Sequence, residues 1–138
     1  MNTANQGYLA ALRAHADECD SDLTELRRRL DEGPWSRFDE KAAERTLQVL
    51  IESAIGAAKH WSKKTSGQVS TDAYTAFRRL AEQGLIESAD TWRAMIGLRN
   101  ALVHDYLEVD PDIIASVLRK KQYEAPLLFV RQAVKALG

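Results

Sequence analysis

Several polar and ionisable side chains lie close together near residue 100, at the end of an otherwise apolar segment. They belong to the run Arg99-Asn100-Ala101-Leu102-Val103-His104-Asp105-Tyr106. A histidine can accept or donate a proton near neutral pH, and an arginine offers a fixed positive charge whose planar fork matches a phosphate. These residue types indicate proton transfer beside a bound anion.

The spacing of these residues determines how they point if the segment is helical. A helical pattern follows Ser88 and is expected to run to about Tyr106. At about 100° and 1.5 Å per residue, Arg99 and Tyr106 then share one face, two turns apart. Asn100 lies on the same side as His104. The ordinary alternative is that the charged groups are solvated, His104 bonds a backbone carbonyl and Tyr106 packs at the helix end.

Apolar periodicity predicts the helices that must position this run. Leucines and small residues at alternating spacings of three and four predict a long first helix over about thirty residues, ended by Gly33-Pro34. A broad apolar face from Phe38 to Trp61 predicts a second helix of roughly 25 residues. The polar segment 62–71 is the expected loop, and it contains Lys63 and Lys64.

The second half of the chain gives the remaining helices. Tyr74, Phe77 and Leu80 predict a short third helix before Gly84, and the run around Arg99 lies on the fourth. A fifth helix starts at Asp110-Pro111 and continues to the C-terminus, with a kink or break expected near residues 122–125 because of Pro126. With no β-pattern visible, the expected fold class is an all-α, antiparallel bundle of about five helices.

Composition narrows the class of protein. The 138 residues predict a single domain over 1–138, and Cys19, the only cysteine, excludes an intramolecular disulfide and a cysteine zinc cluster. A net charge of −1 requires any contact with nucleic acid to be local. No targeting or membrane segment is visible, so a cytoplasmic protein without a membrane partner is expected.

From about Phe38 to Val117 the order of these signals resembles HEPN domains, and specifically the HepT family of bacterial toxins. Three pieces of the sequence match: Glu44-Arg45-x-Leu47-Gln48 through Glu52 and His60, Tyr74-x-x-Phe77-x-x-Leu80-Ala81-x-x-Gly84, and Leu98-Arg99-Asn100-x-Leu102-Val103-His104-x-Tyr106. The last of these pieces fits that family's Arg-x4-His-x-Tyr signature, including the polar residue directly after the arginine.

The resemblance implies a homodimeric, metal-independent endoribonuclease without a cofactor. It also implies the toxin of a toxin–antitoxin module whose antitoxin is a minimal nucleotidyltransferase (MNT). Cleaving RNA by attack of a 2′-hydroxyl needs a base, an acid and a positive charge beside the negatively charged phosphorane oxygens, and His104 and Arg99 are residues of the types that can supply them. One histidine cannot be base and acid at once, so a composite site from two protomers is expected.

Two further residues of the run receive supporting roles. Asn100 is expected to orient His104 or bind phosphate. Tyr106 is similar to the tyrosine that the partner enzyme of this family modifies with AMP. A bulky anionic group beside the cleft would block RNA and occupy Arg99, which would switch the enzyme off.

A second basic cluster lies at the end of the second predicted helix. Lys59, Lys63 and Lys64 surround His60 and Trp61, a combination of charge and aromatic rings that can hold single-stranded RNA. The alternative is an ordinary basic helix end with Trp61 in the core. His15 has no second ligand at metal-binding spacing.

The main alternative function comes from another class of protein. Related helical bundles resemble the substrate-binding subunit of a two-chain nucleotidyltransferase, in which the same arginine and histidine would hold a ligand without catalysis. A plain helical dimerisation adaptor is a third possibility, and it has no use for the motif. A binding subunit is harmless when expressed alone, whereas a ribonuclease is not.

Overall fold

The computed structural model describes residues 3–104 and 109–138, which form six helices and no strand. The all-α fold class predicted from the sequence is therefore confirmed. No described helix has the length and apolar character needed to cross a membrane. The helices are α1 (Thr3–Glu32), α2 (Arg37–Ser66), α3 (Ala73–Glu82), α4 (Thr91–Val103), α5 (Pro111–Arg119) and α6 (Glu124–Leu137).

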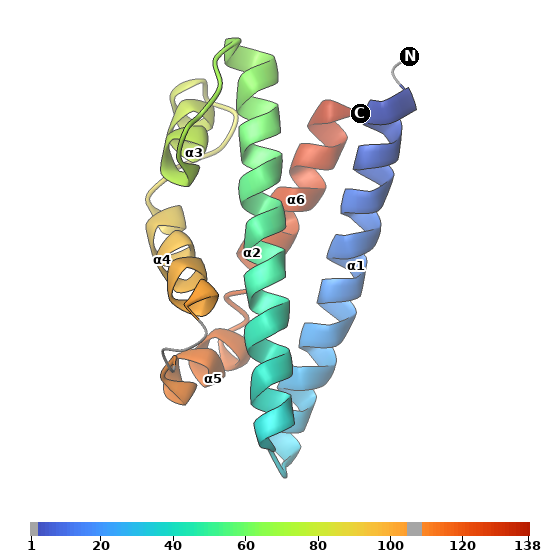
Figure 1. The fold of residues 1–138 in the computed structure, drawn as a ribbon, viewed down its shortest axis with the longest axis vertical. Helices are drawn as coiled ribbons and strands as arrows, with labels where there is room; N and C mark the ends of the chain where they lie inside the picture. The colour runs from blue at the N-terminus through green and yellow to red at the C-terminus, as the bar shows by residue number, and fades with distance from the viewer. Residues whose placement is uncertain (1–2, 105–108) are drawn as a thin grey trace.

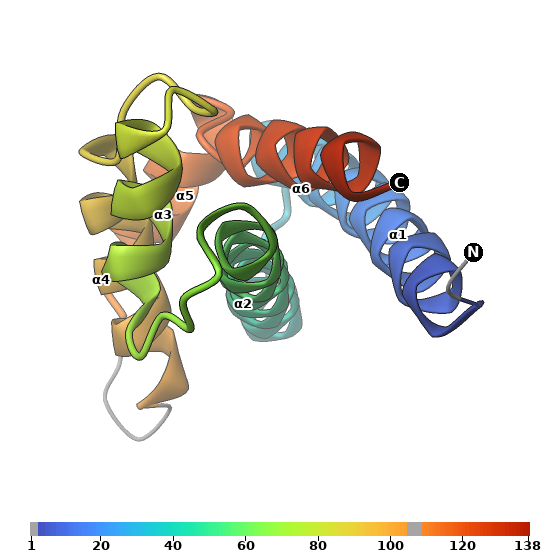
Figure 2. The ribbon, with the colours of Figure 1, turned by 90° about the horizontal axis from the view of Figure 1, so that it is seen from above.

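Helix α2 is the centre of the bundle and packs against each of the other helices. Helices α1 and α6 lie on one side of it, and the shorter α3, α4 and α5 lie on the other (Figures 1 and 2). The chain reverses direction between α1 and α2, and the two termini lie at the same end of the molecule (Figure 1). The core forms where apolar faces of all six helices meet around α2.

The leucines and small residues predicted to recur every three or four positions form an apolar seam along α1, and this seam packs into the core. Because residues three and four apart share one side of a helix, the seam stays continuous over the whole element. Cys19 lies in the seam, and burial together with the nearby Asp22 and Glu18 raises the pKa of its thiol to about 11. It acts as a small apolar residue. The buried residues of α1 are Leu9, Leu12, Ala16, Cys19, Leu23 and Leu26.

A capping box starts α2 and ties it to the end of α1. The Ser36 hydroxyl accepts from the Asp39 backbone N–H at 3.1 Å, and the Asp39 carboxylate accepts from the Ser36 N–H at 2.8 Å. Arg29 Nε donates to the same carboxylate at 2.7 Å. The bonds from Arg29 and Ser36 lower the pKa of Asp39 to about 2, so this junction keeps its charge over the ordinary pH range.

The predicted position of Phe38 on the apolar face of α2 is wrong. Its side chain is 83% exposed, and Ala42 is exposed as well. Phe38 precedes the buried Leu47 by nine residues, which is about two and a half turns, and so it lies on the opposite face.

The predicted loop over residues 62–71 is also wrong in its first half. Helix α2 continues to Ser66, and Gly67 ends it in the left-handed conformation with φ of 74°. The side-chain hydroxyls that made this segment resemble a loop donate hydrogen bonds to backbone carbonyls one turn earlier in the helix. Ser66 Oγ donates to the Ser62 carbonyl at 2.6 Å, and Thr65 Oγ1 donates to the Trp61 carbonyl at 3.2 Å.

An aromatic cluster fixes α4 against the rest of the bundle. The rings of Phe77 (α3) and Trp92 (α4) stack with centroids 4.0 Å apart, and Phe129 (α6) meets the Trp92 ring edge-on at 5.0 Å. Trp61 joins the cluster from α2 and is only 5% exposed, so it is a core residue. The first turn of α4 is therefore held by aromatic rings of α3 and α6.

The break predicted near residues 122–125 is confirmed and makes six helices out of the expected five. Helix α5 ends at Arg119 and α6 begins at Glu124. Pro126 is the third residue of α6, a position whose backbone N–H would have no acceptor within the helix, so the missing N–H of proline costs no hydrogen bond there. Its side chain is fully buried. At the start of α5, the Asp110 carboxylate accepts from the Asp112 N–H at 2.9 Å.

Candidate active site at the end of α4

Arg99 and Asn100 lie in the last turns of α4. Arg99 is half-buried, Asn100 is exposed, and Arg99 Nε donates a hydrogen bond to Asn100 Oδ1 at 2.9 Å. This bond uses the inner donor of the guanidinium and so orients the planar fork, whose terminal amino groups are the donors that suit a phosphate. In the structure Asn100 therefore orients Arg99, a contact that the sequence did not indicate.

His104 directly follows α4, and here the sequence prediction of a helix to about Tyr106 is wrong. The helix ends at Val103, and the His104 backbone has φ of −91° and ψ of 68°, outside the helical region. The predicted stacking of Asn100 over His104 on one helical face therefore does not apply. The imidazole is exposed at the helix end.

Asp105 and Tyr106, the remaining members of the run, lie outside the described residues. The described chain resumes at Val109 and enters α5 at Pro111. Of the described members of the run, Arg99 and Asn100 thus lie on α4 and His104 directly follows its end.

The outer face of α4 carries small residues. Ala94, Gly97 and Ala101 are all exposed, and at about 100° per residue they fall within a sector of about 60°. A Cβ added at Gly97 would meet no atom within 4 Å, so this face is open in the monomer. Another helix could approach α4 closely along it, because the distance between packed helices depends on the side chains at the contact.

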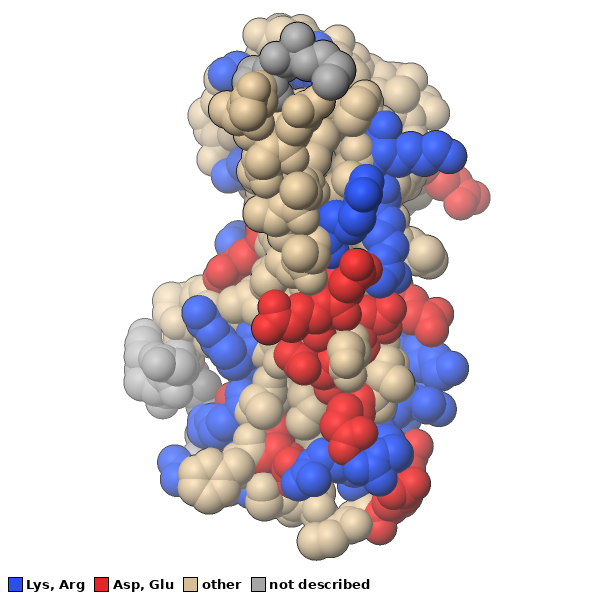
Figure 3. Space-filling view, turned by 90° about the vertical axis from the view of Figure 1, so that its right-hand side faces the viewer, with Lys and Arg blue, Asp and Glu red and all other residues tan. Residues whose placement is uncertain are grey.

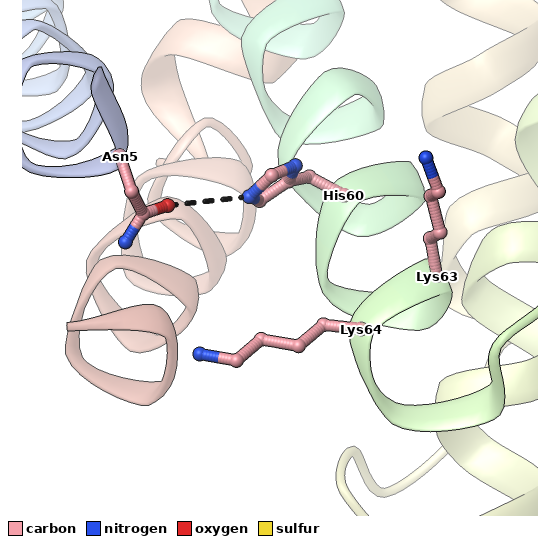
Figure 4. Close-up of a pocket in the computed structure, with 4 residues that line it drawn as sticks. All are labelled: Asn5, His60, Lys63 and Lys64. Carbon is pink, nitrogen blue, oxygen red and sulfur yellow. Dashed lines mark hydrogen bonds between the residues drawn. The ribbon is translucent and has the colours of Figure 1, made fainter. Parts of the chain in front are cut away.

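The structure places two of the three lysines of the second basic cluster beside a cavity and the third outside it. Lys63 and Lys64 lie in the last turn of α2, not in a loop. With Asn5 and His60 they line a cavity of about 400 Å³ (Figure 4). Lys59 does not line it, and its charge contributes to lowering the pKa of Asp72, after the bonds from Thr75. Asn5, 55 residues from His60, is a cavity residue that sequence reasoning missed.

Charge is unevenly distributed over the surface. On the face that includes α1, Asp and Glu side chains gather midway along the molecule, and Lys and Arg side chains lie above and below them (Figure 3). Among the acidic residues of α1, Asp17 and Asp20 bind Arg131 of α6 at 2.9 and 3.0 Å. An RNA backbone would be repelled from the middle of this face. Among the described residues, no group of His, Cys, Asp and Glu side chains is arranged to hold a metal ion.

The sequence and the fold define the class of protein. The family model described as "Ribonuclease HepT-like" matches residues 16–132, which is most of the chain. The chain belongs to the ribonuclease HepT-like family. The resemblance to the HepT family of HEPN domains, drawn from the order of signals between Phe38 and Val117, is therefore confirmed, and the expected nuclease class is confirmed at the level of the family.

Two curated relatives carry the name of this family. The mRNA nuclease HepT of Shewanella oneidensis is 33% identical over 75 residues, which cover 53% of this chain and 56% of that protein. The chain thus matches little more than half the length of this relative. The tRNA nuclease HepT of Aphanizomenon flos-aquae is 31% identical over 100 residues, which cover 70% of this chain and 67% of that protein.

Solved structures share the fold over nearly the whole chain. A tri-AMPylated HEPN toxin of Shewanella oneidensis, in complex with an MNT antitoxin, superposes with a TM-score of 0.76 at 22% identity. The match covers 95% of this chain and 98% of that one. A toxin–antitoxin structure with AMP-PNP gives a TM-score of 0.75 at 22% identity over 94% of this chain and 99% of that chain.

Proposed function

We propose that this protein is the toxin of a toxin–antitoxin module, a metal-independent endoribonuclease that cleaves RNA in the cytoplasm, with residues 1–138 acting as a single HEPN domain. The observation that carries the proposal is the end of α4, where a guanidinium oriented by Asn100 precedes an exposed histidine in a chain of the ribonuclease HepT-like family. Arg99 and His104 are the proposed catalytic residues, and Asn100 positions Arg99.

The proposed reaction breaks one P–O bond and forms another. The ribose 2′-hydroxyl loses its proton to a base and attacks the adjacent phosphorus, the 5′-oxygen leaves, and an acid protonates it. The products are a 2′,3′-cyclic phosphate and a free 5′-hydroxyl. Imidazoles suit both proton transfers, and Arg99 would stabilise the charge on the phosphorane oxygens. The reaction needs no other co-reactant.

The site is proposed to be composite, formed by two copies of this chain. A base and an acid are needed at the same moment, and two protomers supply two His104 and two Arg99 to one cleft. The open, small-residue face of Ala94, Gly97 and Ala101 supports this arrangement, because it lets a second α4 approach closely. An isologous contact of this kind places the two His104 symmetrically about the dimer axis.

The test of the proposed function is cleavage of labelled RNA by the purified protein. The expected products are discrete fragments with cyclic phosphate ends. The substrate-binding subunit of a two-chain nucleotidyltransferase, the alternative function, would leave the RNA intact. Intact protein mass must first show that the preparation carries no nucleotide adduct.

Tyr106 is proposed as the residue through which an MNT antitoxin inactivates the enzyme. Its phenolic oxygen attacks the α-phosphorus of ATP, the phenolic proton is lost, pyrophosphate leaves, and AMP remains joined through a phosphodiester. The proposal rests on the Arg-x4-His-x-Tyr motif and on the AMPylated state of the similar Shewanella oneidensis toxin. The added phosphate would compete with RNA for Arg99.

Incubation with the antitoxin and ATP is therefore expected to add the mass of AMP and abolish RNA cleavage. The Tyr106→Phe variant should keep its cleavage activity, gain no mass and resist inactivation. Peptide mapping by mass spectrometry locates the adduct. Full modification of Tyr106→Phe at another residue, with the same loss of cleavage, would overturn the assignment.

A further inference from the structure

The cavity at the far end of α2 joins three helices at the end of the bundle where the termini lie. Asn5 comes from the first turn of α1, and His60, Lys63 and Lys64 come from the last turns of α2. The end of α6 closes one side, because Asn5 Nδ2 and Lys64 Nζ both donate to the Leu137 carbonyl. None of these residues belongs to the Arg99 and His104 site.

The side chains around the cavity are held in place by contacts across the bundle. His60 Nε2 lies 3.4 Å from Asn5 Oδ1, and the His60 ring packs against Tyr8 with centroids 5.3 Å apart. Figure 4 shows Lys64 reaching across the opening toward Asn5, while the Lys63 ammonium points away from the space that Asn5, His60 and Lys64 surround. Lys64 is therefore the cation best placed to contact a group in that space.

The contact that holds Lys64 is weak and replaceable. Its Nζ lies 3.5 Å from the Leu137 carbonyl, at the limit of a hydrogen bond, whereas Asn5 Nδ2 donates to the same oxygen at 3.3 Å. Lys64 can therefore turn to an incoming anion while Asn5 continues to satisfy the carbonyl. A charge-assisted bond to an anion is stronger than the neutral contact that it replaces.

The local charge favours an anion. Every described ionisable residue that lines the cavity is a lysine or a histidine, and no carboxylate is among them. The first turn of α1 lies beside the cavity and contains no acidic residue, so the positive end of its dipole is not neutralised there. The Asp and Glu side chains on the face that Figure 3 shows gather midway along the molecule, away from the end where the termini lie.

We propose that this cavity binds a backbone phosphate of the RNA, with Lys64 and His60 as its ligands, and so forms a substrate-binding subsite away from the cleavage site. The proposal rests on the proposed ribonuclease function, which supplies the polyanion. A single-stranded RNA presents a phosphate at every nucleotide, so a strand that is cleaved at one site can at the same time place another of its phosphates in a basic cavity far from that site. Such a contact adds affinity for any sequence and does not select a base.

The test measures binding of a labelled, fully 2′-O-methylated RNA, which keeps the phosphates and lacks the attacking hydroxyl. Its affinity is measured by fluorescence anisotropy over a series of salt concentrations. For single strands each lost phosphate contact reduces the slope of log affinity against log salt by about 0.7. Lys64→Ala should show this reduction and Lys64→Arg should not. Lys59→Ala is the matched control, because Lys59 lies on the same helix and does not line the cavity.

The outcomes separate this proposal from the proposed function. A reduced slope for Lys64→Ala alone, at an unchanged melting temperature, supports the cavity. Equal slopes in the parent and Lys64→Ala, or equal reductions in Lys64→Ala and Lys59→Ala, would overturn it. So would failure of the parent to bind this RNA. Cleavage of unmodified RNA by the parent is assayed in parallel, and it decides the ribonuclease function whichever result the slopes give.

Discussion

The His104→Ala variant is expected to cleave RNA about 10²- to 10⁴-fold more slowly than the parent, the range that general acid–base catalysis contributes. In a symmetric dimer the substitution removes both the base and the acid of the proposed composite site. His104 is exposed beyond the end of α4, so its loss should leave the fold intact. Single-turnover cleavage of a labelled RNA measures the effect.

The control is His15→Ala, which removes an imidazole from α1 that lies 3.6 Å from Cys19 Sγ. That variant should cleave at the rate of the parent. Equal melting temperatures for the parent and His104→Ala would show that the loss is chemical. If His104→Ala cleaved as fast as the parent, the catalytic role of the histidine would be refuted.

The Gly97→Leu variant is expected to be monomeric and to lose at least about 10²-fold in cleavage, because removal of one protomer removes half of the acid–base pair. A Cβ at Gly97 meets no atom within 4 Å, so leucine is accommodated in the monomer. Leucine also favours the helical conformation over glycine by about 0.8 kcal/mol, and the variant should fold at least as stably as the parent. Only a second chain packed on this face would be displaced.

Gly7→Leu is the matched control for this prediction. Gly7 also lies inside a helix and its added Cβ also meets no atom within 4 Å, but it belongs to α1. It should remain dimeric and active. Light scattering after gel filtration gives the oligomeric state. A Gly97→Leu variant that stays dimeric and active would exclude this face of α4 from the interface.

The fold was predictable wherever a periodic pattern and a local stop signal agreed. The apolar seam of α1, the stop at Gly33 and the Asp110-Pro111 start of α5 all agree with the sequence predictions, because each depends on neighbours within one or two turns. The structure adds the cap of α3, where Asp72 accepts from the Thr75 N–H at 2.8 Å. Pro126 marked the break that separates α5 from α6.

Two errors in the predicted fold concern the residue at which a helix ends. The segment after Trp61 is polar enough for a loop, but its hydroxyls bond to carbonyls one turn back and α2 continues to Gly67. The chain between Val103 and Asp110 contains no glycine or proline, so nothing in it marked the end of α4 before His104. The site residues were recognised by type and spacing, but their relative geometry depended on that end.

The cavity of Asn5, His60 and Lys64 depends on contacts that no local pattern reveals. Its bonds join residues 55, 73 and 132 positions apart, and they exist because α1, α2 and α6 meet at one end of the bundle. The basic residues of α2 were the available signal. Their division into Lys64 at the cavity and Lys59 outside it follows from the direction in which each side chain leaves the helix.

Incubation of the adduct-free parent protein with labelled cellular RNA in excess EDTA decides whether the protein is a metal-independent ribonuclease. Discrete fragments that end in a 2′,3′-cyclic phosphate are expected, because the two proton transfers and the charge stabilisation are all proposed to come from side chains. Cleavage that stops when EDTA is added, or that leaves a 5′-phosphate on the fragments, would contradict the proposed mechanism. Intact RNA under every condition would contradict the ribonuclease function itself.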